Sequence, residues 1–174
     1  VMETFDVHCD VTTDNHIYVE VLTDEMRDKY REYLIEPKAI GDLRDVPLEP
    51  LKFTISGEPS TLDELVSQLD ARYGADLKFV RSGEHFIDIM KAGTTKGKAL
   101  NILVDHLQIE RKDVIAIGNY YNDTEMLQYA GLGIAMDNSP ADLKTIADDI
   151  TRSNNDDGVR VALQKWLSSD RIVR

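Results

Sequence analysis

The sequence predicts an α/β protein built from two modules, an α+β module over residues 1–92 and an α/β layer with a parallel sheet over residues 93–174. Apolar and polar residues alternate in short segments of the first module, which is typical of half-buried, mostly antiparallel strands. The second module alternates continuous apolar strands with helices, which favours a parallel sheet. Charge differs as well, because the first module has 20 acidic and 10 basic residues and the second has 12 and 10. On charge alone, a more solvated first half explains this difference equally well.

In the first module, the alternation predicts strands over Phe5–Val11 and His16–Val21, joined by a turn into a hairpin. The remaining predicted elements are a helix over 24–34, a strand over 51–55, a helix that begins at Ser60 or Thr61, and strands over 77–80 and 86–90.

The second module is predicted to contain a helix from Thr95, a strand over 114–117 buried on both faces, a helix over 125–130, a strand over 132–136, a helix up to Ala147, a short strand over 149–151 and a last helix over 159–167. Gly131 is expected to end its helix in the left-handed conformation. Ser139 and Pro140 are expected to cap and open the next one. The inward-facing stripes are Leu100, Leu103, Val104 and Leu107 in the first helix, and Val159, Ala162, Leu163, Trp166 and Leu167 in the last.

Composition excludes several classes of protein. With 42% apolar residues among 174, a packed core is expected and global disorder is not. The net charge of −12 argues against nucleic-acid partners and against docking on an anionic membrane. No apolar run approaches the roughly 20 residues of a membrane-spanning helix. The single cysteine, Cys9, excludes an internal disulfide and favours a cytoplasmic location.

The loop after the strand 114–117 carries candidate chemistry. Ligands of open α/β sheets bind at the carboxyl ends of the strands, where Gly118 begins a turn that contains Asn119, Asn122 and Asp123. These residues offer hard oxygen ligands of the kind that Mg²⁺ prefers. The alternative is that the asparagines and the aspartate only form the turn and cap the next helix.

A lysine, Lys96, stands in the first turn of a predicted helix, where a cation opposes the helix macrodipole. An anionic ligand would give this lysine a reason to be there. The alternative is a solvated lysine that happens to lie near the start of a helix.

Together these segments resemble the haloacid dehalogenase superfamily, in its Cof-type phosphatase branch. Its lysine motif is matched by Lys96-Gly97-Lys98-Ala99-Leu100, and its Gly-Asp-x-x-Asn-Asp motif by Gly118-Asn119-Tyr120-Tyr121-Asn122-Asp123. The segments 130–138 and 151–159 are also similar to the family. The resemblance implies that residues 93–174 form the C-terminal half of a Rossmann-like hydrolase core, and more loosely that residues 1–92 form an α/β cap that selects the substrate.

The resemblance implies a Mg²⁺-dependent phosphatase acting on small phosphorylated metabolites of the sugar-phosphate type. An aspartate nucleophile attacks the phosphate monoester, and water then hydrolyses the aspartyl-phosphate. Lys96 would hold the phosphate and stabilise the transition state, with Asn122 positioning the phosphate. Asn119 and Asp123 are the metal-site candidates, and Asp123 would act through metal-bound waters or by supporting the ligands.

Two departures from the family pattern change these expectations. The 174 residues contain no Asp-x-Asp-Gly-Thr nucleophile motif, so we expect the nucleophile segment to be missing and this chain alone to hydrolyse no phosphate monoester. Asn119 stands where the family has an aspartate that ligates the metal, so metal affinity should fall. An alternative function is therefore a non-catalytic phosphate-binding or interaction module. An incomplete core sheet would also expose an edge through which the chain could form homo-oligomers.

Polar residues on the strands of the first module are weaker candidates for substrate contacts. They are His8, Lys52, Thr54 and His85. Asp6 and Asp10 lie on the same strand face as His8, but strand alternation already explains that pattern without a metal.

Overall fold

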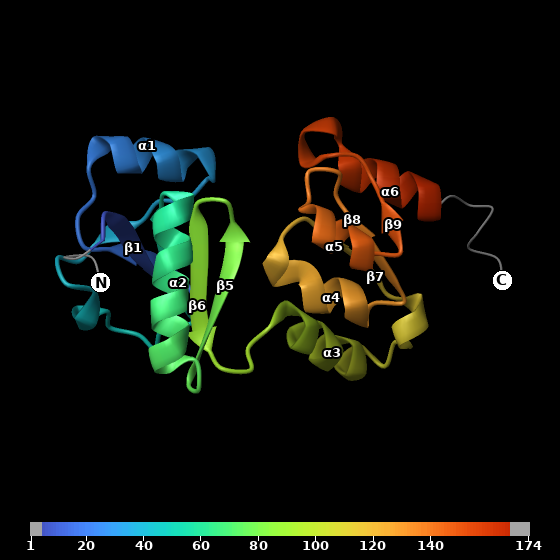
Figure 1. Ribbon diagram of the computed structural model, residues 1–174, viewed down its shortest axis with the longest axis horizontal. Coiled ribbons are helices and arrows are strands. Elements are labelled where there is room, and N and C mark those ends of the chain that lie inside the picture. The colour runs from blue at the N-terminus through green and yellow to red at the C-terminus, as the bar shows by residue number, and fades with distance from the viewer. Residues whose placement is uncertain (1–4, 168–174) are drawn as a thin grey trace. The chain divides into compact units, whose positions relative to one another are not determined.

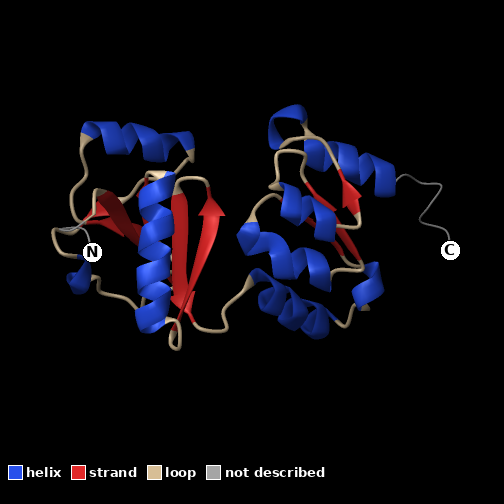
Figure 2. Cartoon of the chain, viewed as in Figure 1, coloured by secondary structure: helices blue, strands red, loops and turns tan. Residues whose placement is uncertain are grey.

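The computed structural model describes residues 5–167, and the chain divides into two compact units, Val1–Ala92 and Gly93–Arg174 (Figure 1). Each unit combines a sheet with helices (Figure 2). Within residues 5–167, no helix is long and apolar enough to cross a bilayer.

The first unit is built on a six-stranded sheet with the strand order β3-β2-β1-β4-β6-β5. Neighbouring strands are antiparallel except for β2 and β3, which are parallel. The elements are β1 (Val7–Thr12), β2 (Ile17–Val19), α1 (Asp24–Glu32), β3 (Lys38–Ala39), η1 (Leu43–Asp45), β4 (Lys52–Gly57), α2 (Pro59–Tyr73), β5 (Leu77–Gly83) and β6 (Phe86–Lys91).

Helix α2 covers the apolar face of this sheet. Its buried Leu62 and Leu65 pack against Ile55 of β4 and Ile87 of β6. Because side chains alternate along each strand, the polar residues of β1, β4 and β6 lie on the opposite face. The alternation seen in the sequence therefore gives the unit one buried face and one polar face.

The second unit holds a three-stranded parallel sheet with the order β7-β8-β9. Leu127 of α4, Leu143 of α5 and Ala116 of β7 form its core cluster, with Leu100 of α3 packed against them. The elements are α3 (Lys96–Leu107), η2 (Arg111–Asp113), β7 (Ile115–Gly118), η3 (Tyr121–Asp123), α4 (Thr124–Tyr129), β8 (Leu132–Ala135), α5 (Ala141–Ile146), β9 (Asp149–Ile150), η4 (Asn154–Asp156) and α6 (Gly158–Trp166).

The predicted burial of two helices is partly wrong. On α3, Val104 is buried, but Leu103 and Leu107 are 51% and 53% exposed. On α6, Ala162 is buried, whereas Val159, Leu163 and Leu167 are about half exposed and Trp166 is half-buried. Polar contacts also hold α6, since Asp149 accepts hydrogen bonds from Lys165 Nζ at 2.6 Å and from Trp166 Nε1 at 2.8 Å.

The prediction that β7 is buried on both faces is also wrong for part of the strand. Ala116 and Gly118 are buried, but Ile115 and Ile117 are only half-buried. Among the described residues β7 pairs with β8 alone, so its other edge carries free backbone groups.

Two residues that were expected to cap helices, Gly131 and Ser139, do not do so. Gly131 is not left-handed. A Cβ there would lie 2.5 Å from the carbonyl oxygen of Lys112, so glycine is required by close packing instead. Ser139 does not cap α5, because Pro140 occupies the N-cap position and makes no side-chain cap bond.

Candidate functional site

The turn after β7 is organised around Asp123. The carboxylate is buried, and its Oδ2 accepts backbone N–H bonds from Asn119 at 2.8 Å and Tyr120 at 3.3 Å. Gly118 permits this arrangement, since a Cβ there would lie 2.5 Å from the Asp123 Cβ. Strand β7 therefore delivers a buried carboxylate at its carboxyl end, fixed by the turn that it forms.

Lys96 provides the positive charge that faces this carboxylate. Its Nζ lies 2.5 Å from Asp123 Oδ1. The lysine side chain is 51% exposed and the aspartate side chain 5% exposed, so the ammonium lies between the buried carboxylate and solvent. The unfavourable place of Lys96 in the first turn of α3 is thus offset within the protein by Asp123.

The ends of α3 and α4 hold the lysine in place. Thr95 caps α3, because its Oγ1 accepts the N–H of Lys98 at 3.1 Å, and the same hydroxyl donates to Glu125 Oε2 at 2.5 Å. A Cβ on the buried Gly97 would lie 2.6 Å from the Cβ of Glu125. The Gly97 contact therefore lets α3 approach α4 closely enough for Lys96 to meet Asp123.

The two asparagines of the predicted site lie in the same turn. Asn119 is exposed and contributes its backbone N–H to Asp123, and Asn122 is half-buried in η3. The structure thus brings Lys96, Asn119 and Asp123 into one hydrogen-bonded group, with Asn122 beside them in sequence. Asp123 does form the turn, as the alternative interpretation predicted, and it also contacts Lys96.

The described residues fit Mg²⁺ incompletely. Asp123 is already engaged by an ammonium and two backbone amides, so a cation would compete with Lys96 for the same carboxylate. Asn119 offers only a neutral amide oxygen. Over residues 5–167, no group of three or more His, Cys, Asp or Glu side chains is arranged to hold a metal ion. The described residues therefore do not supply a set of anionic ligands for Mg²⁺.

The polar face of the first unit carries a groove of about 820 Å³. All four weaker candidates, His8, Lys52, Thr54 and His85, line it. Sequence reasoning missed two further polar lining residues, Tyr30 and Asp88, and set Asp10 aside because strand alternation already explained its position. Strand alternation placed Asp10 on the face of His8, but nothing in the sequence indicated that Tyr30 of α1 would reach it.

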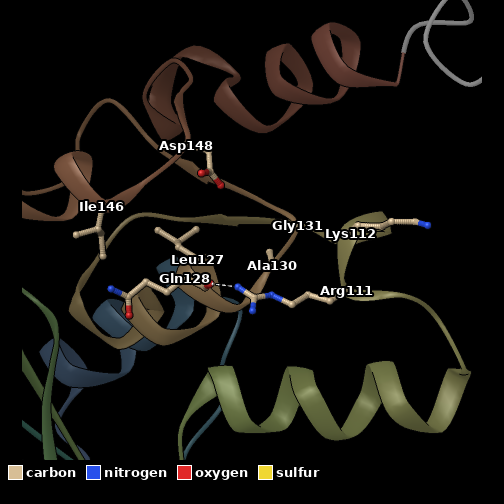
Figure 3. Close-up of a pocket in the computed structure, with 8 residues that line it drawn as sticks. All are labelled: Arg111, Lys112, Leu127, Gln128, Ala130, Gly131, Ile146 and Asp148. Carbon is tan, nitrogen blue, oxygen red and sulfur yellow. Dashed lines mark hydrogen bonds between the residues drawn. The ribbon is translucent and has the colours of Figure 1, made fainter. Parts of the chain in front are cut away.

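A second cavity, of about 740 Å³, lies at the amino edge of the parallel sheet (Figure 3). Its residues precede β7, β8 and β9 or come from the helices beside them, and Arg111 Nη2 donates to the carbonyl oxygen of Gln128 at 2.7 Å. Because Asn119 and Asp123 follow β7, this cavity is at the opposite edge from them. It is lined by Arg111, Lys112, Leu127, Gln128, Ala130, Gly131, Ile146 and Asp148.

Comparison with known proteins identifies the family. The model of the haloacid dehalogenase-like hydrolases matches residues 1–163. The chain belongs to this family. It has the features of the Cof-type branch, as the motifs around Lys96 and Asp123 indicated.

Named relatives of this hydrolase chain extend beyond it in length. It is 29% identical over 178 residues to the 5-amino-6-(5-phospho-D-ribitylamino)uracil phosphatase YitU of Bacillus subtilis, covering 97% of this chain and 63% of the relative. A haloacid dehalogenase-like hydrolase from Bacteroides thetaiotaomicron has a TM-score of 0.74 at 30% identity, with 94% and 62% covered. A subclass IIB sugar phosphatase of the superfamily shares the fold, with a TM-score of 0.74 at 21% identity and 91% and 60% covered. The chain therefore spans less than two thirds of each.

Proposed function

We propose that this chain carries the phosphate-binding part of a phosphatase that acts on small phosphorylated metabolites. The contact between Lys96 and Asp123 carries the proposal, because it holds an ammonium, half exposed, at the carboxyl edge of the parallel sheet. The relative YitU, named as a phosphatase for a phosphorylated ribitylamino-uracil, supports a small-molecule substrate. Under this proposal residues 93–174 are the C-terminal part of the hydrolase core and residues 1–92 are the substrate-selecting cap.

Each residue then has a defined task. The Lys96 ammonium binds the phosphate oxygens and stabilises the negative charge that develops on them, and Asn122 orients the phosphate. Asp123 is a positioning residue that holds Lys96 through its Oδ1 while the turn amides hold Oδ2. These 174 residues contain no Asp-x-Asp-Gly-Thr motif. Under this proposal the nucleophilic carboxylate is therefore supplied from outside them.

Mg²⁺ is the cofactor we propose for the complete protein. Bound near the phosphate, it would neutralise charge on the phosphate oxygens. Asn119 and Asp123 would border the ion, Asn119 through its amide oxygen and Asp123 by holding the surrounding groups in place. Its anionic ligands would have to come from outside the 174 residues.

A turnover assay tests whether the 174 residues lack the nucleophile, as proposed. The 174-residue chain with Mg²⁺ is expected to release no p-nitrophenol from p-nitrophenyl phosphate above the rate of buffer. A turnover that scales with the concentration of the chain and survives repeated purification would show that these residues hold a nucleophile of their own, and the proposal would then be wrong.

We also propose that the chain self-associates through the free edge of β7. Over residues 5–167 β7 has a strand partner on one side only, and the exposed Leu103 and Leu107 of α3 add apolar surface to the same unit. Light scattering after size-exclusion chromatography is expected to give a mass above 19.7 kDa that falls with dilution. A monomeric mass at every concentration would contradict self-association.

A further inference from the structure

The groove on the polar face of the first unit lies between the sheet and α1. It belongs wholly to that unit and contains a cluster of polar side chains from β1, β4, β6 and α1. None of these residues takes part in the phosphate chemistry proposed above. The cluster consists of His8, Asp10, Tyr30, Lys52, Thr54 and Asp88.

Two carboxylates stand on this face with one threonine between them. Asp10 of β1 pairs in register with Thr54 of β4, and Thr54 pairs with Asp88 of β6. Asp10 is 8% exposed and Asp88 7% exposed. Because burying a carboxylate is costly unless a partner compensates it, each needs a hydrogen-bond donor or a cation.

Asp88 has its partners within the chain. Lys52 Nζ lies 3.0 Å from Asp88 Oδ1, and Thr54 Oγ1 donates to the same oxygen at 3.5 Å. This ion pair shows that the face accommodates an ammonium against a buried carboxylate.

Asp10 is compensated only in part. Its Oδ2 accepts a hydrogen bond from Tyr30 Oη at 3.0 Å, but within residues 5–167 its buried Oδ1 has no hydrogen-bond partner. Burial raises the pKa of Asp10 above its usual range, and the Tyr30 hydroxyl, the Lys52 charge and the Thr54 hydroxyl offset that rise only in part. The χ2 torsion of aspartate is broad, so Oδ1 can turn toward the groove without a change in the backbone.

The charges around the groove do not balance. Lys52 is the ammonium that serves the two carboxylates, and the other lining lysine, Lys29, pairs with Glu25 at 3.0 Å. His8 contacts Tyr30 Oη at 3.1 Å, and burial lowers its pKa, which favours the neutral ring. Because Asp6, Glu32 and Glu58 line the groove as well and these two lysines are its cations, negative charge is in excess around Asp10.

We propose that this groove binds a small ligand through a protonated amino group that pairs with the Asp10 carboxylate. An ammonium supplies both a positive charge and a donor for Oδ1, whereas a hydroxyl group supplies only the donor. Residues Thr54 and His8 on either side would bond to neighbouring polar groups of the same ligand.

Calorimetric titration of the 174-residue chain with glucosamine and glucose tests the proposal. The two sugars differ by an amino group in place of one hydroxyl, and at about pH 6.5 such an amine is protonated. Glucosamine is expected to bind at least about tenfold more tightly than glucose, since hydrogen bonds to a charged group are the stronger kind. Equal affinity of the chain for both sugars, or no binding of glucosamine, would overturn the proposal, and this comparison needs no variant.

Asp10→Asn keeps the shape of the side chain and removes its charge. In a folded variant the preference for glucosamine over glucose is expected to disappear. Asp76→Asn is the matched control, because Asp76 is an exposed aspartate of the same unit outside the groove, and it should keep the preference. An unchanged preference in folded Asp10→Asn would assign the amine to another residue and would refute the pairing with Asp10.

Glucosamine 6-phosphate separates two sources of the amino group. Tighter binding of the phosphate ester than of glucosamine indicates an amine carried by a phosphorylated metabolite, and equal binding indicates a free amine. Both outcomes support an ammonium site, and both require glucosamine to be preferred over glucose. The proposal rests on the proposed function in that the groove belongs to the substrate-selecting unit, but the two fail separately, because turnover and phosphate binding test Lys96 and this titration tests Asp10.

Discussion

Lys96 Nζ lies 2.5 Å from Asp123 Oδ1, and this contact joins the start of one helix to the turn before another. The carboxylate is buried and fixed by backbone amides, whereas the ammonium is half exposed. A lysine held in this way has lost side-chain freedom before any ligand arrives, so a bound anion would have less ordering to induce. The contact depends on a close approach of α3 to α4.

Gly97→Ala should therefore destabilise the protein. Alanine favours helix by roughly 1 kcal/mol over glycine, but the new Cβ would lie 2.6 Å from the Glu125 Cβ and force α3 away from α4. The expected net loss is about 1–3 kcal/mol in the free energy of unfolding, measured with urea. Asn101→Ala, at an exposed position of the same helix, is the control and should be neutral or slightly stabilising. If both variants change the free energy of unfolding by the same amount, the close approach of α3 to α4 does not contribute to stability.

Asn119→Asp should raise the affinity of the chain for Mg²⁺. The change adds a negative charge beside the site, and unit charges about 4 Å apart interact by about 4 kcal/mol at an effective dielectric near 20. Competition from Lys96 reduces that gain, so we expect a tenfold or greater fall in Kd by calorimetry, on the order of 1.4 kcal/mol. Asn101→Asp adds the same charge on an exposed part of α3 and should leave the Kd unchanged. An effect of equal size in both variants would remove Asn119 from the metal site.

The stability of the ligand-free chain should depend on pH through Asp10. Burial raises its folded-state pKa above the usual 3.8, so the folded protein binds this proton more tightly than the unfolded chain. The resulting stabilisation is complete below about pH 4 and is lost as the pH rises through the folded-state pKa. Asp10→Asn removes this dependence, so relative to wild type it should gain stability between pH 4 and 7 in urea unfolding. If the difference in unfolding free energy between Asp10→Asn and wild type stays constant over that pH range, the pKa of Asp10 is not raised in the folded protein.

Much of the fold could be predicted from local patterns. Period-2 alternation located the hairpin of β1 and β2, and the apolar run at 114–117 located β7 within one residue. The two-residue strand β3 (Lys38–Ala39) was missed because both residues are exposed and carry no alternation. Gly131 was misinterpreted because sequence shows a glycine after a helix but not the Lys112 carbonyl that packs against it.

The helix faces and the groove depended on tertiary contacts. Helix α6 has an apolar stripe, yet Val159 and Leu163 on it are exposed, whereas Lys165 and Trp166 of the same helix hydrogen-bond to Asp149. Of the site residues, Lys96 and Asp123 were recognisable as parts of motifs, but their direct contact was not. Asp10 was recognisable on the face of His8, but its hydrogen bond from Tyr30 was not, since Tyr30 lies 20 positions away on a helix.

Titration of the chain with inorganic phosphate, followed by ³¹P NMR, tests whether Lys96 is the phosphate-binding group. Wild type is expected to bind phosphate with a Kd on the order of 1 mM, and Lys96→Met to bind at least about tenfold more weakly. Lys98→Met removes an exposed lysine from the same helical turn and should leave the Kd unchanged. Equal binding by wild type and Lys96→Met, or equal losses in the two lysine variants, would contradict the claim.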